Sequence, residues 1–160
     1  EFATAHPEID MFIIPVGGGG MISGMSAAIK LARPSATVIG VEPFGADSMF
    51  RSFVAEEPVR LDKITTIADS LASPMAMPYS FGVTHHYADE IVRVEDDELR
   101  QAMRIYQNIL KITAEPACAA SLAALTGPLK ERATGRHVGI IACGSNISMA
   151  RYLNLLEQKQ

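Results

Sequence analysis

The stretch that decides the fold is Met11-Phe-Ile-Ile-Pro-Val-Gly-Gly-Gly-Gly20, an apolar run followed directly by four glycines. A short, continuous apolar run is typical of a strand that is buried on both faces, as in a parallel sheet. Beyond the glycines, residues 21–31 carry apolar side chains at helical spacing, and Pro34 marks the end of that helix. Residues 37–41 predict the next strand. A strand, a helix and a second strand in this order form a βαβ unit, whose strands are parallel.

The remaining segments continue the alternation of strands and helices. We expect a strand at residues 90–94 and a last strand at 138–142. Residues 66–72 are compatible with a helical turn or with an extended segment. Further helices are expected at residues 47–54, 96–112, 116–125, 129–133 and 147–158. This pattern predicts an α/β fold, a parallel sheet with helices on both faces, formed by a single domain over residues 1–160.

The composition excludes several classes of protein. The 160 residues include 14 basic and 18 acidic side chains, so the formal net charge is −4. Without a basic excess, nucleic acid and anionic membranes are poor partners, and no apolar stretch is long enough to span a bilayer. Two cysteines are too few for a disulfide framework, so we expect a reducing, cytoplasmic location. The chain starts without methionine and reaches its first strand at Met11, so we expect it to be part of a longer protein.

The glycine run lies where a strand ends and a helix begins, which is a place where proteins bind anions. Unpaired backbone N–H groups and the helix dipole attract negative charge there, and glycines let a ligand approach the backbone without obstruction. We therefore interpret Gly17, Gly18, Gly19 and Gly20, with the N–H of Met21, as a phosphate cradle. The alternative is a flexible turn that is kept free of side chains so that helix and sheet can pack.

The glycine run does not fully match either of two common phosphate-binding loops. A P-loop ends in Gly-Lys-Ser/Thr, and no such triplet follows the glycines. A dinucleotide loop needs Gly-x-Gly-x-x-Gly; Gly18 and Gly20 match its first two glycines, but Ser23 stands at the third. Glu42, at the end of the next strand, stands about where a ribose-binding acid would be. A nicotinamide- or flavin-binding Rossmann domain therefore remains an alternative.

A second group of candidates follows later strands and loops. Cys143 opens the turn Cys143-Gly-Ser-Asn146 after the last strand, at the edge of a parallel sheet where ligands bind. It is either a small hydrogen-bonding group that faces a ligand or a structural cysteine. Glu115, just before Pro116, either faces a ligand or satisfies the start of the helix that follows. Both readings stay open for both residues.

A possible cation site lies after the second strand. Glu42, the carbonyl of Ala46 and the hydroxyl of Ser48 could supply oxygen ligands to a hard cation. Such a cluster is more often only a loop with helix caps. The sequence by itself leaves both interpretations open.

Five motifs, taken in order, resemble one known family. They are Pro15-Val-Gly-Gly-Gly-Gly-Met21, Gly40-Val-Glu-Pro43, Thr66-Ile-Ala-Asp69, Glu115-Pro116 followed by small residues, and Cys143-Gly-Ser-Asn-Ile147. Over nearly its whole length the chain is similar to the C-terminal half of the pyridoxal-phosphate enzymes of fold type II. Within that family it most resembles the threonine/serine dehydratases (threonine ammonia-lyases) and serine racemase. The resemblance implies the cofactor-binding large domain of the tryptophan synthase beta-like architecture, present here only in part.

The resemblance also implies roles for the cofactor residues. Gly17–Gly20 and Met21 match the loop that holds the phosphate of pyridoxal phosphate. Cys143 matches the position, usually serine, that hydrogen-bonds the pyridine nitrogen, and Glu115 matches a glutamate near the cofactor. Ser70 stands where the family usually has glycine, which adds bulk near the expected pocket.

For the cation, the resemblance implies a divalent site, for Mg²⁺ or Ca²⁺. Glu42, Ala46 and Ser48 match its positions. Ser48 stands where an acid often lies in the family, so one formal charge is lost.

By the same resemblance, the complete protein is a lyase of amino-acid metabolism. It would eliminate water from a hydroxy amino acid such as threonine or serine and yield a 2-oxo acid and ammonia. Serine racemase or 3-hydroxyaspartate ammonia-lyase activity is the alternative within the family. A non-catalytic module that binds a phosphate-bearing ligand is the alternative outside it.

The family's Schiff-base lysine is expected outside this chain. In the family it lies in an N-terminal motif, and that context surrounds none of the lysines here, which are Lys30, Lys63, Lys111, Lys130 and Lys159. We therefore expect the chain to be inactive alone and to need the missing N-terminal half of the same enzyme. The family also implies a homo-oligomer.

Overall fold

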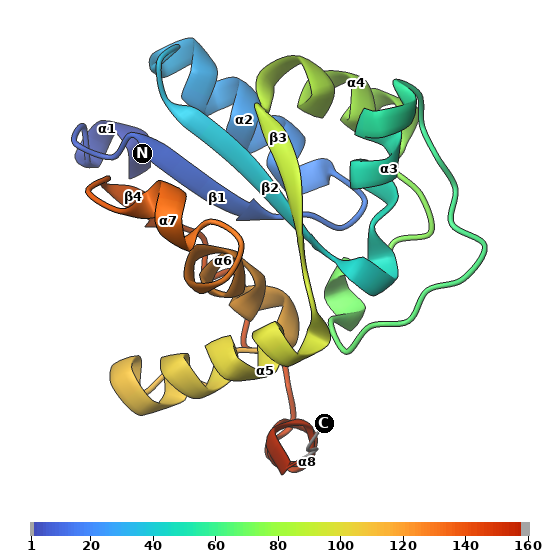
Figure 1. The fold of residues 1–160 in the computed structure, drawn as a ribbon, viewed down its shortest axis with the longest axis vertical. Coiled ribbons are helices and arrows are strands. Elements are labelled where there is room, and N and C mark those ends of the chain that lie inside the picture. The colour runs from blue at the N-terminus through green and yellow to red at the C-terminus, as the bar shows by residue number, and fades with distance from the viewer. Residues whose placement is uncertain (1, 158–160) are drawn as a thin grey trace.

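The computed structural model describes residues 2–157, and its centre is a parallel four-stranded sheet. The strand order is β3-β2-β1-β4 (Figure 1). Each neighbouring pair of strands is parallel, which confirms the predicted sheet. The strands are β1 (Met11–Pro15), β2 (Thr37–Pro43), β3 (Glu90–Val94) and β4 (Val138–Ile140).

Alternate residues of β1 supply two separate cores, one on each face of the sheet. All five residues of the strand are buried. Met11 and Ile13 belong to one apolar cluster, and Phe12 and Ile14 belong to the other. Because side chains alternate along a strand, a run that is apolar at every position requires apolar cover on both faces. The sequence of β1 is therefore the reason why helices lie on both sides.

Helices cover the two faces in separate groups (Figure 1). The cluster around Phe12 is completed from α2 (Gly20–Ala32), α3 (Ser48–Ala55) and α4 (Pro78–Tyr87). The cluster around Ile13 is completed from α5 (Asp96–Ile105), α6 (Pro116–Thr126) and α8 (Met149–Glu157). The short helical elements are α1 (Phe2–Ala5), α7 (Lys130–Ala133) and the 3₁₀ turns η1 (Phe44–Ala46) and η2 (Asp69–Leu71).

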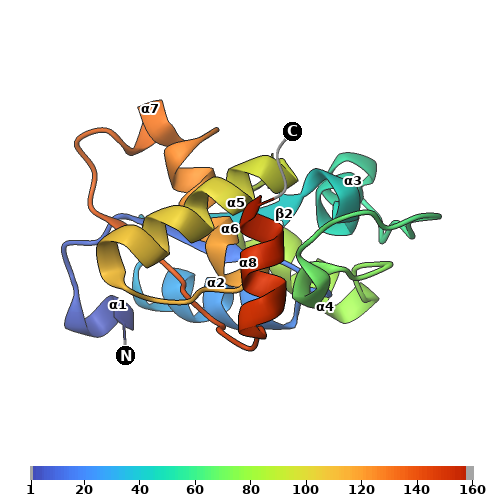
Figure 2. The same ribbon diagram turned by 90° about the horizontal axis from the view of Figure 1, so that it is seen from below.

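Helix α6 packs directly under the sheet because its side chains are small. Residues 116–121 are all buried. Ser121 Oγ donates a hydrogen bond of 3.0 Å to the carbonyl oxygen of Ile13 in β1. Helix α8 lies beside α5 (Figure 2), and Tyr152 donates a hydrogen bond of 3.2 Å to the carbonyl oxygen of Met103.

The structure corrects several predicted boundaries. The helix expected over residues 96–112 is α-helical only to Ile105, and a π-helical turn, η3 (Tyr106–Leu110), completes it. The wider turn keeps Tyr106 buried while Ile109 and Leu110 are exposed. The last strand ends at Ile140, earlier than expected, and α8 begins at Met149; residue 158, to which that helix was expected to extend, lies outside the described residues.

Helix α4 is absent from the sequence prediction. Four prolines between residues 43 and 82 point to irregular structure there. Pro78, however, stands at the first position of α4, where the missing N–H costs nothing. Among residues 2–157, no helix is long and apolar enough to cross a membrane.

Candidate functional site

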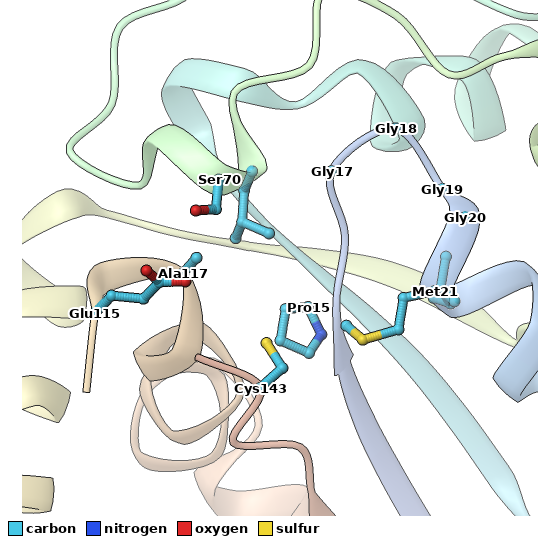
Figure 3. Close-up of a pocket in the computed structure, with 12 residues that line it drawn as sticks. Pro15, Gly17, Gly18, Gly19, Gly20, Met21, Ser70, Glu115, Ala117 and Cys143 are labelled. Atoms are coloured by element: carbon cyan, nitrogen blue, oxygen red, sulfur yellow. The ribbon is translucent and has the colours of Figure 1, made fainter. Parts of the chain in front are cut away.

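A cavity of about 330 Å³ opens at the carboxyl end of β1, where the glycine run begins (Figure 3). The seven residues that the sequence singled out for the cofactor all line it: Gly17, Gly18, Gly19, Gly20, Met21, Glu115 and Cys143. They come from three segments far apart in the chain. The wall is completed by residues that the sequence did not assign to a ligand, namely Pro15, Ile22, Ser70, Leu71 and Ala117.

Gly19 is a position that only glycine fills without strain. Its φ is +90°, in the left-handed region. A Cβ added there would lie 2.7 Å from Met49 Cε and 2.9 Å from Ser80 Cβ. The apex of the loop is thus packed from outside by α3 and α4, while its inner side faces the cavity.

The amino-terminal end of α2 is arranged to receive an anion. Gly19 is its N-cap and makes no side-chain cap, and the first turn carries no acidic side chain. The first amides of an α-helix have no carbonyl partner within the helix, and the dipole adds about half a positive charge there. The four glycines line the cavity (Figure 3), and they place no side chain between it and these amides. A phosphate group therefore fits this wall in charge and in space.

Cys143 lies on the opposite wall of the cavity. Its side chain is exposed, and its sulfur points toward the space between α6 and the glycine loop (Figure 3). Although the residue is exposed, partial desolvation of the sulfur raises the pKa of its thiol, and the neighbouring Cys118 raises it further. The thiol is therefore protonated at neutral pH and is a neutral hydrogen-bonding group, not an activated nucleophile.

Glu115 directs its carboxylate into the same space rather than to the helix that follows it (Figure 3). Its side chain makes no cap to α6. Its backbone N–H donates a 3.2 Å hydrogen bond to the Gly144 carbonyl oxygen. A Cβ on Gly144 would overlap the Glu115 carboxylate, so the glycine after Cys143 makes room for that group. Of the two open readings, the geometry favours a carboxylate that faces a ligand.

A second hollow of about 230 Å³ adjoins the first and shares Glu115 with it. Asp69 and Arg151 form an ion pair of 3.1 Å along its wall, and Asn146 and Ser148 also line it. In the sequence, Asp69 belongs to one of the five family motifs, and nothing marks Arg151. The residues meet because η2 and the first turn of α8 lie near each other beside Pro116, at the start of α6.

The proposed cation ligands lie elsewhere, beside α3. Glu42 is fully buried, and both its carboxylate oxygens accept hydrogen bonds from the start of α3, from Met49 N–H at 2.9 Å and from Phe50 N–H at 2.7 Å. Burial raises the pKa of Glu42 to about 8. The Ser48 hydroxyl is buried, with no hydrogen-bond partner among the described residues. Glu42 thus caps a helix and is not free to hold a ribose.

No cluster of three or more His, Cys, Asp or Glu side chains that could hold a metal ion occurs within residues 2–157. The oxygens offered at the predicted cation site are one carboxylate already engaged by two amides, one neutral hydroxyl and one carbonyl. Mg²⁺ and Ca²⁺ require several oxygen ligands, usually with more negative charge. These residues do not fit a divalent cation.

A family model described as "Pyridoxal-phosphate dependent enzyme" matches residues 1–144. The chain is 47% identical over 158 residues to a phenylserine dehydratase of Ralstonia pickettii, covering 97% of this chain and 48% of that protein. It is 33% identical over 154 residues to an L-threo-3-hydroxyaspartate ammonia-lyase of Saccharomyces cerevisiae, covering 96% of this chain and 47% of that protein.

Among solved structures, the processed form of threonine deaminase isoform 2 from Solanum lycopersicum superposes with a TM-score of 0.93 at 27% identity. The match covers 98% of this chain and 46% of that one. The chain therefore spans about half the length of the curated relatives that it matches.

Proposed function

Because the chain belongs to the pyridoxal-phosphate dependent enzymes, we propose that the cavity between the glycine loop and Cys143 holds pyridoxal phosphate. We further propose that the complete enzyme eliminates water from a β-hydroxy amino acid and releases a 2-oxo acid and ammonia. The observation that carries this proposal is the meeting of Gly17–Gly20, Glu115 and Cys143 in one cavity.

The glycine loop supports the phosphate end of the proposal. The amides at the start of α2 would donate hydrogen bonds to the phosphate oxygens, and the positive end of the helix dipole would stabilise their charge. Met49 and Ser80 hold the loop from behind, so the amides are fixed before a ligand arrives.

Cys143 and Glu115 support the other end. Pyridoxal phosphate, when bound, supplies an electron sink for the electrons released at the α-carbon of an amino acid. Cys143 would contact the ring nitrogen as a neutral partner, which leaves that nitrogen unprotonated and moderates the sink. Its thiol is a weaker hydrogen-bonding group than the usual serine hydroxyl. Glu115 would present its carboxyl group to the same space.

The proposed site lacks a lysine among the described residues, because none of the residues that line the cavity is a lysine. We propose that the Schiff-base lysine belongs to a part of the enzyme outside this chain, and that the chain alone binds the cofactor without catalysis. For this chain taken alone, the cavity wall without a lysine favours the alternative of a non-catalytic module that binds a phosphate-bearing ligand.

The substrate is proposed from the relatives. The 47% identity to a phenylserine dehydratase makes 3-phenylserine the first substrate to test, before threonine, serine and 3-hydroxyaspartate. Racemisation of serine is the competing activity, because the maize serine racemase shares the fold at a TM-score of 0.88.

The test uses the complete enzyme that carries these residues, loaded with pyridoxal phosphate. Each hydroxy amino acid is incubated with it, and 2-oxo acid, ammonia and the opposite enantiomer are measured. We expect equal amounts of 2-oxo acid and ammonia from at least one β-hydroxy amino acid. Formation of the opposite enantiomer without ammonia, or no turnover of any of the four, would contradict the proposal.

A further inference from the structure

The segment expected to bind a cation is built around an arginine instead. Arg93 lies on β3 directly opposite Glu42 of β2 in the strand register. Paired residues of neighbouring strands direct their side chains to the same face of a sheet. Arg93 therefore projects beside Glu42 toward the start of α3, which lies against this end of the sheet (Figure 1).

The guanidinium of Arg93 is held on several sides. Its Nη1 lies 3.0 Å from Asp47 Oδ2, and the Asp47 side chain is almost fully buried. Its Cζ lies 4.4 Å from the centre of the Phe44 ring and 3.7 Å from that of Phe50. A planar guanidinium can stack on aromatic faces and pair with a carboxylate at once, which an ammonium does less well.

The buried carboxylate of Asp47 is paired without a metal. Glu42 and Asp47 are the acids, and Asp47 pairs with both Arg93 and Arg51 at 3.0 Å and 2.8 Å. Ser48 contributes no charge. A divalent cation placed here would meet one carboxylate engaged with helix amides and the positive charge of Arg93 close by. Coulomb repulsion between like charges at short range opposes its binding.

We propose that Arg93 supplies, from within the chain, the positive charge that a divalent cation supplies in the resembled enzymes, and that it ties residues 43–50 to β3 without a metal. Arg93 is thus a positioning residue for the start of α3. Met49 on that helix packs behind Gly19, so the position of α3 also affects the glycine loop. This inference stands on the ion pair and the stacking, and does not rest on the proposed activity.

The experiment compares thermal unfolding of the chain in CaCl₂ and in EDTA. For the wild-type chain we expect the same melting temperature in both, within about 1 °C. Arg93→Thr should lower it by roughly 5 °C, because the buried Asp47 loses the less exposed of its two arginine partners and two rings lose their contact. Arg51→Met is the matched control: Arg51 pairs with the same carboxylate but is largely exposed, so about 1 °C is expected.

A variant that gains metal binding distinguishes the proposed role of Arg93, as a substitute for the cation, from a merely structural role. Ser48→Asp combined with Arg93→Thr restores an acid and removes the arginine, so Ca²⁺ should raise the melting temperature of this double variant by roughly 3 °C or more. Ser48→Asp alone, which keeps Arg93, should show no such rise. The inference is overturned if Ca²⁺ stabilises the wild-type chain, if Ser48→Asp alone gains as much as the double variant, or if Arg93→Thr costs no more than Arg51→Met.

Discussion

Gly19 is the single residue on which the shape of the cavity depends most. We expect Gly19→Ala to lower the free energy of unfolding by about 1–3 kcal/mol, because the new Cβ must adopt φ +90° and meet Met49 and Ser80. The same change should weaken pyridoxal-phosphate binding at least tenfold, since the loop amides shift. Urea unfolding and a cofactor titration measure the two effects.

Gly24→Ala is the matched control for that prediction. Gly24 lies inside α2, and a Cβ there meets nothing within 4 Å. Alanine is the better helix former, so this variant should be as stable as the wild type or more stable by up to about 1 kcal/mol. Equal stability and equal cofactor affinity of Gly19→Ala and Gly24→Ala would show that the loop conformation is not required.

Cys143 gives a second prediction at this scale, measured in the complete enzyme. Cys143→Ser keeps a neutral hydrogen-bonding group of similar size, so we expect activity equal to or above that of the wild type. Cys143→Ala removes the group and should lower kcat by about tenfold, the effect of losing one hydrogen bond. Cys118→Ala, at a buried neighbour that does not line the cavity, is the comparison variant. Full activity of Cys143→Ala would contradict the proposal that Cys143 contacts the ring nitrogen of the cofactor.

Individual site residues were predictable where they follow strands. The positions of Gly17–Gly20 and Cys143 could be anticipated because parallel strands end at one edge of a sheet. Ser70 was expected near the pocket only through the family resemblance, whereas Leu71 reaches the cavity from the same 3₁₀ turn and no periodicity marks it. The pairing of Arg93 with Asp47 depends on strand register, which a single sequence does not reveal.

At the scale of the element, the start of α3 is capped by a buried acid, and this predicts a pH dependence. Burial raises the pKa of Glu42 from an ordinary value of 4.5 to about 8. Between these pH values the folded chain keeps a proton that the unfolded chain has released. The contribution of Glu42 is therefore complete below about pH 4.5 and is lost as pH rises to about 8, by up to about 1.4 kcal/mol per pH unit.

The measurement is urea unfolding of the wild-type chain and of Glu42→Gln from about pH 5 to pH 9, a range that brackets the shifted pKa. Glutamine has a similar shape and no titrating proton, so the difference in stability between the two chains should change with pH as described. A difference that stays constant over the whole range would mean that Glu42 has an ordinary pKa and that its burial is tolerated in the charged form.

Helices and strands were predictable to different degrees. The βαβ unit of β1, α2 and β2 is confirmed. It could be predicted because a continuous apolar run, apolar residues at helical spacing and a second apolar run follow one another clearly in the sequence. Helix α4 could not be predicted, since its prolines carry the same signal whether they break a helix or begin one. The π-helical turn after Ile105 depends on burying Tyr106 against the core, a tertiary effect that local sequence does not encode.

At the scale of the whole molecule, the sheet and its two covering layers form a platform with a cavity at one edge. The chain belongs to the pyridoxal-phosphate dependent enzymes and spans about half the length of its curated relatives. The predicted α/β class and parallel sheet are confirmed, because they follow from the apolar pattern of the strands. The proposed activity needs a lysine that the cavity wall lacks within the described residues.

The measurement that tests the central claim most directly is a binding titration of this chain with pyridoxal phosphate and, separately, with NADH. We predict saturable binding of pyridoxal phosphate that inorganic phosphate displaces, and no binding of NADH. After borohydride treatment and denaturation, intact mass should be unchanged, because no lysine among the described residues lines the cavity. Binding of NADH without pyridoxal phosphate, or a mass increase from cofactor fixed to the chain, would contradict the account.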